Sequence, residues 1–203
     1  MKKVDLKKVF SEYYSVKKNA VALVTVPAFN YLNVLGQGNP NTSQEYKEAV
    51  EALFALSYAI KFKIKKGAQE IDYGVMPLEG QWWTDDMSDF SIDNKDIWKW
   101  NSCIMQPEYV TKEIVEECRA EVKAKKDVAA IDKVEFLNVT DGLSAQILHI
   151  GAYAEEKPTI EKLHNFILEK GYQLTGKHRE IYLSDFRKAA PENLKTIIRQ
   201  PIS

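Results

Sequence analysis

Two glutamates set among aromatic side chains are the residues of this sequence best suited to chemistry. Glu79 lies in the stretch 72–83 (DYGVMPLEGQWW), which ends in two tryptophans, and Glu180 lies in 178–185 (HREIYLSD). Aromatic faces stack on flat organic molecules and stabilise positive charge, while a carboxylate supplies the counter-charge. These two stretches therefore predict the walls of one pocket for a small planar or cationic organic molecule.

The alternation of side chains along a strand selects further residues, because neighbouring residues point to opposite faces. In 178–184, Ile181 and Leu183 share one face, which suits a core beneath helices. His178, Glu180 and Tyr182 share the other face and are expected to point into the pocket. The same reasoning applies to 146–153. The side chains predicted to bind the ligand are Tyr73, Glu79, Trp82, Trp83, Trp100, His149, Tyr153 and His178, together with Glu180 and Tyr182.

Each of these side chains also has a structural interpretation, which the sequence leaves open. A tryptophan pair at a strand end packs in a core more often than it lines a ligand site, and His149 suits a hydrogen-bonded structural role. The three histidines are too scattered to bind a metal. The sequence contains no phosphate-binding glycine loop, nucleophile elbow or triad motif, so we expect neither a metal nor a cofactor.

Composition places the chain among globular proteins and limits its partners. The 203 residues carry 28 Lys and Arg against 29 Asp and Glu, so no net field attracts nucleic acid or an acidic membrane. The two cysteines, Cys103 and Cys118, form neither a disulfide framework nor a zinc motif, and no apolar run reaches membrane-spanning length. We expect a cytoplasmic protein that binds neither nucleic acid nor a membrane, and the oligomeric state stays open.

The elements that must position these residues follow the same order in both halves of the chain. On either side of a helix at 111–126, each half reads strand, helix, strand, strand. In the first half we expect a short helix at 4–16, strands at 21–26 and 29–35, a helix from a capping box at 42–45 to Gly67, and strands at 71–78 and 97–105. In the second half we expect a hairpin of 134–139 and 143–153 around Asp141-Gly142, a helix from Pro158, and strands at 178–184 and 194–199.

This repeated order predicts an α+β fold in a single domain, 1–203, built from two modules of the same topology. Module one covers about 19–110 and module two about 133–203, with the helix at about 111–126 between them. We expect a pseudo-twofold between the modules, antiparallel sheets with helices on one face, and the ligand cleft on the other face. A cleft between duplicated modules is a usual place for a ligand.

Short motifs spread over nearly the whole chain also carry a family resemblance. They are 26–32 (VPAFNYL) with 36–40 (GQGNP), 77–83 (PLEGQWW), 98–100 (WKW) with 106–111 (QPEYVT), 146–151 (QILHIG), and 178–185 (HREIYLSD) through 199–201 (RQP). On these motifs the sequence resembles the GyrI-like small-molecule-binding family, and in particular its stand-alone bacterial members.

The resemblance implies a pair of strand–helix–strand–strand modules with a ligand cleft between them. In members that are effector domains of multidrug-responsive transcription regulators, a buried glutamate of the last module binds cationic drugs, and Glu180 matches that position. Some stand-alone members hydrolyse the strained cyclopropane of planar DNA-alkylating natural products and so detoxify them. One member inhibits DNA gyrase.

Residues and resemblance together lead us to expect a binding protein that hydrolyses planar strained electrophiles. Glu180 would act as general base or electrostatic partner, Tyr182 or Tyr109 would donate a proton, and Glu79 would be a second acid. The tryptophans would stack on the planar body of the substrate. Two alternatives stay open: a protein that binds drugs or metabolites without chemistry, to sequester or sense them, and a protein–protein inhibitor such as a gyrase modulator.

Overall fold

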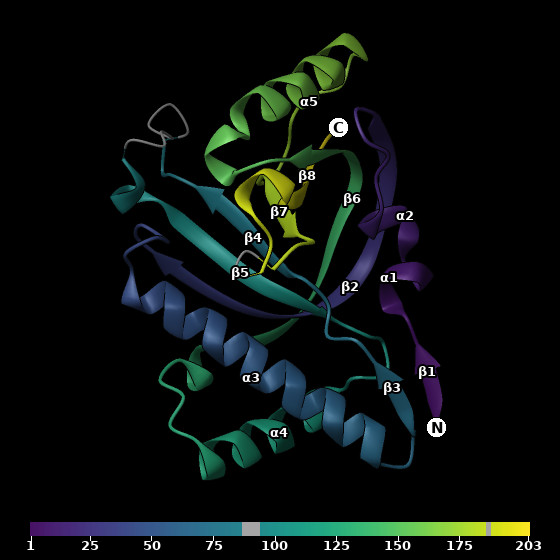
Figure 1. Cartoon of the computed structure of the whole chain (residues 1–203), viewed down its shortest axis with the longest axis vertical. Helices are drawn as coiled ribbons and strands as arrows, with labels where there is room; N and C mark the ends of the chain where they lie inside the picture. The colour runs from purple at the N-terminus through teal and green to yellow at the C-terminus, as the bar shows by residue number, and fades with distance from the viewer. Residues whose placement is uncertain (87–93, 186–187) are drawn as a thin grey trace.

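Six antiparallel strands close into a barrel at the centre of the computed structural model (Figure 1). The structure describes residues 1–86, 94–185 and 188–203. The strands are β2 (Val21–Gln37), β4 (Leu78–Trp83), β5 (Lys99–Gln106), β6 (Glu135–Ile150), β7 (Arg179–Tyr182) and β8 (Lys195–Pro201). Around the barrel their order is β2-β5-β4-β7-β8-β6.

Helices pack on the outside of the barrel and make the fold α+β, as predicted. The long helices are α3 (Gln44–Lys66), α4 (Lys112–Lys125) and α5 (Lys157–Glu169). In Figure 1, α3 and α5 lie on well-separated parts of the barrel, and α4 packs on α3. The remaining elements are β1 (Lys2–Val4), its parallel partner β3 (Ile71–Tyr73), α1 (Leu6–Val9), α2 (Ser11–Tyr14), and short 3-10 helices at Lys95–Ile97, Ile131–Lys133, Tyr153–Glu155 and Pro191–Asn193.

The helix predicted from 42–45 to Gly67 is confirmed as α3. Leu53, Leu56 and Ile60 recur at helical spacing and are fully buried against the sheet. At the start of α3, the Ser43 hydroxyl accepts a hydrogen bond from a backbone N–H of the first turn at 3.2 Å. The helix ends at Gly67, as the sequence predicted.

The repeated order of elements is confirmed by the strand pairing. Exchange of β2-α3-β4-β5 with β6-α5-β7-β8 reproduces the whole set of barrel pairs, because β2–β5 maps onto β6–β8 and β4–β5 onto β7–β8. The two modules join at β4–β7 and at β2–β6, pairs that map onto themselves. The barrel therefore has the pairing of a pseudo-twofold, whereas the residue limits of the modules stay a prediction.

Two predicted interruptions of strands are wrong. Asp141-Gly142 does not form a hairpin, and the strands predicted at 21–26 and 29–35 are one strand, because β6 and β2 are continuous and pair along their length. Gly142 has φ of 69°, which lets β6 bend within the ladder instead of reversing. The predicted strand at 71–78 divides into β3 and the start of β4, and the predicted helix at 4–16 divides into α1 and α2.

The register of β4 and β7 separates the two glutamates of the predicted pocket. Glu79 is paired with Ile181 and Gly80 with Glu180, and directly paired residues share a face, so the two carboxylates leave the sheet on opposite sides. Glu180 is also paired with Ile198, which belongs to the apolar cluster under α5. Glu180 therefore lies on the helix-covered outside of the barrel, whereas Glu79 faces the barrel interior.

Candidate ligand-binding site

Glu180 on β7 is the acid of the candidate site. Its Oε2 accepts a hydrogen bond from the Tyr182 hydroxyl at 2.7 Å, and that hydroxyl accepts one from Trp82 Nε1 at 3.0 Å. His178 Nε2 lies 3.3 Å from Glu180 Oε1. The side chains of His178 and Glu180 keep 14% and 15% of their surface exposed, so the acid is in contact with solvent.

A glycine makes the space in which these hydrogen bonds form. Gly80 lies directly opposite Glu180 across the β4–β7 pair. A Cβ atom at this position would lie 2.8 Å from Trp82 Nε1 and 2.9 Å from the Tyr182 hydroxyl oxygen. A larger residue would therefore push apart the pair that orients Glu180.

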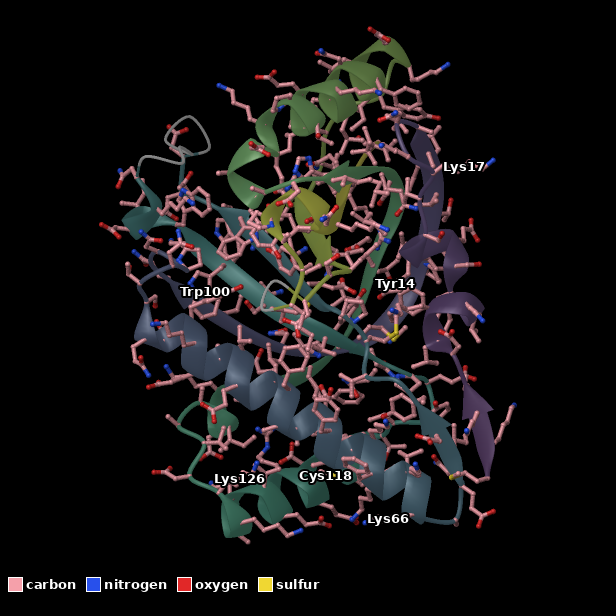
Figure 2. The ribbon with its side chains drawn as sticks, in the orientation of Figure 1. Tyr14, Lys17, Lys66, Trp100, Cys118 and Lys126 are labelled. Atoms are coloured by element: carbon pink, nitrogen blue, oxygen red, sulfur yellow. The ribbon has the colours of Figure 1, made fainter. Side chains whose placement is uncertain are left out.

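Aromatic rings from different elements pack beside this acid. The Trp82 ring centroid lies 5.6 Å from that of Tyr46 on α3 and 5.7 Å from that of Trp98. Tyr46 meets Trp100 edge-on at 5.1 Å, and Figure 2 shows Trp100 beside α3. Trp100 has no exposed surface, so it supports the other rings from below.

Tyr153 and Tyr182 form the other edge of the site, with ring centroids 5.4 Å apart. Burial, and next the nearby carboxyl groups of Glu156 and Glu180, raise the pKa of Tyr153 to about 12. Burial, and then Glu180, raise the pKa of Tyr182 well above its ordinary value. Both hydroxyls are therefore protonated at neutral pH, and Tyr182 donates to Glu180.

Glu156 is a second acid of this site, and the sequence pattern did not reveal it. It directly precedes α5 and is only 4% exposed. Burial, and next the Glu180 carboxylate, raise the pKa of Glu156 to about 9, so it is a neutral carboxylic acid at pH 7. The Thr196 hydroxyl lies near it, although Glu156 Oε1 and Thr196 Oγ1 have no well-aligned hydrogen-bond partner among the described residues.

Glu156 and Glu180, the two acids on the outer face, differ from most buried carboxylates in that no lysine or arginine of the described residues balances their charge. Within residues 1–86, 94–185 and 188–203, neither Glu156 nor Glu180 forms an ion pair with a lysine or arginine, and His178 is the one basic neighbour of Glu180. A buried acid without a cation partner keeps its proton or accepts an external cation. The site is therefore suited both to proton transfer and to binding of a positively charged molecule.

Glu79 belongs instead to a charge-balanced network inside the barrel. It accepts a hydrogen bond from the Tyr14 hydroxyl at 2.7 Å and pairs with Arg179 at 2.9 Å; Figure 2 labels Tyr14 far from Trp100. Arg179 Nη2 donates to Asp141 Oδ1 at 3.0 Å, and Arg199 Nη1 lies 3.8 Å from Asp141 Oδ2. The prediction that Glu79 is a second acid in the ligand cleft is wrong, because this carboxylate is fully buried and paired on the other face.

The predicted residues Tyr73 and Tyr109 lie at the far end of the molecule from Glu180. Their rings pack on each other with centroids 5.8 Å apart. Tyr73 is on β3, outside the barrel, and Tyr109 follows the end of β5, whereas Trp100 lies at the start of that strand. Neither tyrosine therefore lies beside Glu180, and their roles as proton donor and ligand contact stay predictions.

Trp83 and His149 are also separated from the site. Trp83 follows Trp82 on β4 and so points to the opposite face, where Lys177 Nζ lies 3.3 Å from its ring centroid. His149 has both ring nitrogens occupied, Nδ1 with Thr159 Oγ1 at 2.9 Å and Nε2 with the carbonyl of Ala152 at 3.2 Å. This histidine thus supports the turn before α5, which is the structural alternative.

The structure brings together six of the predicted residues and adds three. Tyr46 was not considered as a site residue, because it lies on a helix and the cleft was expected on the other face of the sheet. The only feature of the sequence that singles out Glu156 is its position at a helix start, two residues before Pro158. The predicted members that meet are Trp82, Trp100, Tyr153, His178, Glu180 and Tyr182, and the added ones are Tyr46, Trp98 and Glu156.

Two hollows lie on other parts of the described surface. One hollow of about 380 Å³ is lined by residues such as Gln37, Trp83 and Lys99, and another of about 210 Å³ lies beside Leu6 and Met76. Among the described residues, no three His, Cys, Asp or Glu side chains are arranged to hold a metal ion. In the same part of the chain, no helix has the length and apolar character needed to cross a membrane.

Comparison with known proteins places the site in context. The profile of the GyrI-like small molecule binding domain matches residues 20–203. Two structures from Listeria innocua align with a TM-score of 0.90: an uncharacterized conserved protein, 37% identical over 98% of this chain and 100% of that chain, and a hydrolase, 36% identical over 100% of both. The C-terminal domain of EcmrR, 12% identical over 91% of this chain and 97% of its own, shares the fold with a TM-score of 0.56. No curated protein matches the sequence.

Proposed function

Because the chain belongs to the GyrI-like family of small-molecule-binding domains, we propose that its Glu180 cluster binds planar or cationic organic molecules and hydrolyses strained planar electrophiles of the cyclopropanoid type. The observation that carries the proposal is a partly exposed carboxylate among aromatic rings, with no lysine or arginine partner among the described residues. The similarity to a hydrolase over the full length of both chains supports the enzymatic half.

In the proposed reaction the two acids divide the transfer of protons. A water attacks the methylene carbon of a cyclopropane fused to a cyclohexadienone, and Glu180 takes a proton from that water. The bond from this carbon to the ring breaks, its electron pair moves to the conjugated carbonyl oxygen, and Glu156 protonates that oxygen to give a phenol. The proton on Glu180 then passes to Glu156, which restores both groups and leaves the net addition of one water.

The aromatic residues hold the reactants. Trp82 and Tyr153 stack on the planar body of the substrate. Tyr182, predicted as a proton donor, is assigned a positioning role instead, because its raised pKa makes it a weaker acid than Glu156 and its hydroxyl is bound to Glu180. A reducing cytoplasm is the proposed location, in keeping with two buried free cysteines.

The test is the rate of ring opening of a spirocyclopropyl cyclohexadienone, followed by the absorbance of the phenol product. E180Q is expected to lower kcat by about 10²–10⁴-fold, since a general base is lost. E155Q is the matched control, because Glu155 is an exposed acid next to Glu156, and its kcat should equal that of the wild type. A wild-type protein that binds the compound without accelerating ring opening overturns the enzymatic half.

A second candidate function is binding without chemistry, to sequester or sense organic cations. It is favoured by the bonding of Glu180 to Tyr182 and by the packed rings, which suit a cation's counter-charge and need no attacking water. In this case E180Q weakens the binding of planar cations, and neither protein produces the phenol.

A further inference from the structure

Glu156 and Glu180 form a pair of acids on the outer face, and we propose that they hold one proton between them in the free protein, which a planar organic cation expels to solvent when it binds beside Glu180. This inference rests on the proposed function, from which it takes the role of Glu180 as a counter-charge. It adds that the site exchanges a proton for its ligand and prefers cations to neutral molecules of the same shape.

The position of Glu156 shows no structural use for its carboxyl group. Glu156 is the residue before α5, yet its side chain does not cap the helix. The residue is only 4% exposed, and Oε1 has no hydrogen-bond partner in the described part of the chain. Burial of a carboxyl group with one unsatisfied oxygen destabilises a fold, so a group kept in this state beside Glu180 points to a role in the ligand site.

The arrangement of charges explains why a proton leaves. Glu156 is buried beside the partly exposed Glu180, and two carboxyl groups so close do not both ionise. The free pair therefore carries one proton and a charge of −1, which agrees with the raised pKa of Glu156. A cation against the pair favours the second negative charge and lowers the pKa of Glu156. The pair then carries −2 and the ligand +1, so the total charge of the buried site is −1 before and after binding.

Other ionisable groups lie around the pair, so a measured release of protons has to be assigned to one of these groups. The tyrosines hold their protons through the pH range of interest, because their pKa values are raised. His178 contacts Glu180 and therefore requires a control variant. The groups that face the pair or its neighbours are Tyr46 on α3, Tyr153 before α5, His164 on α5, and His178, Tyr182 and Asp185 on and after β7.

The experiment is calorimetric titration of the whole protein at about pH 8 in two buffers with different ionisation enthalpies, which gives the protons released per ligand bound. The probes are 1-methylquinolinium and its neutral isostere 1-methylnaphthalene. We expect release of about 0.5–1 proton per cation with the wild type and with H178Q, and none with the isostere or with E156Q. The cation affinity of the wild type, but not of E156Q, should rise on the order of tenfold from about pH 6.5 to 8.5.

The possible failures separate the two proposals. Cation binding that depends on Glu180 but releases no proton overturns the exchange and leaves the proposed function standing. Release that persists in E156Q also overturns it, because another group then supplies the proton. A cation that does not bind, or that binds E180Q as tightly as the wild type, overturns both. If E156Q does not fold, the pH dependence of wild-type affinity decides alone, and a flat profile contradicts the exchange.

Discussion

The two faces of the β4–β7 pair both bury acids, but they stabilise them in different ways. On the inner face, Glu79 is neutralised by Arg179 within a network that closes the barrel interior. On the outer face, Glu180 and Glu156 have no lysine or arginine partner among the described residues, and a proton takes the place of a cation. Arg179 and Glu180 are neighbours on β7, so one short strand contributes to stability on one side and to the ligand site on the other.

The largest effect is expected from removal of Arg179, the cation that neutralises the acids on the inner face. R179M leaves Glu79 and Asp141 as buried carboxylates without their main partner, which should lower the free energy of unfolding by about 3–5 kcal/mol. E180Q on the same strand should stay within about 1 kcal/mol of the wild type, because that acid has no lysine or arginine partner among the described residues. Urea unfolding measures both, and equal losses would contradict the division between the two faces.

Gly80, which lies opposite Glu180 across the β4–β7 pair, provides the next test. G80A places a Cβ against Trp82 Nε1 and the Tyr182 hydroxyl, and such overpacking should cost about 1–3 kcal/mol of stability and weaken ligand binding. G74A is the matched control, since nothing lies within 4 Å of a Cβ at that position, and its effect should stay under about 0.5 kcal/mol. Thermal unfolding and ligand titration check the pair, and a G80A protein that behaves like G74A would contradict the close approach.

The pH dependence of stability tests the protonated acid directly. The pKa of Glu156 is raised to about 9 in the folded protein, so the native state holds a proton that the unfolded chain loses near its ordinary pKa of about 4.3. Because the native state then binds more protons, this group makes stability fall as pH rises from about 5 to 9.

E156Q should remove that part of the decline, by at least about 1 kcal/mol between these pH values, while E155Q keeps it. Chemical unfolding at a series of pH values compares the variants with the wild type. Parallel curves for wild type and E156Q would show that Glu156 holds no extra proton in the native state.

The smallest effects are expected far from Glu180. The hydroxyls of Tyr73 and Tyr109 have no hydrogen-bond partner in the described part of the chain, so Y73F and Y109F should change stability by less than about 0.5 kcal/mol. Both variants should bind ligand and turn over substrate as the wild type does, in assays run beside Y182F. A loss of turnover in Y109F would restore this residue to the site.

The order of elements could be predicted from the sequence, because helical spacing and turn residues are local signals. The same signals wrongly predicted a hairpin at Asp141-Gly142, where long-range pairing of β6 with β2 overrides a strong turn motif. Strand alternation correctly grouped His178, Glu180 and Tyr182 on one face.

Alternation within one strand could not show which side of a closed barrel that face is, since this depends on the register between strands. Glu79 was therefore assigned to the wrong face, and the helix-borne Tyr46 was not considered. Glu156 lies in the connection before α5, where no periodicity constrains the direction of a side chain.

The affinity of 1-methylquinolinium and of 1-methylnaphthalene for wild type, E180Q and E155Q is the most direct measurement of the central claim. Quenching of tryptophan fluorescence reports it, because Trp82 lies within the site. E180Q should weaken the cation by at least about tenfold, or about 1.4 kcal/mol, and change the neutral isostere by less than about twofold, while E155Q changes neither. Equal loss of both ligands in E180Q, or no loss of the cation, would contradict Glu180 as the acid of the ligand site.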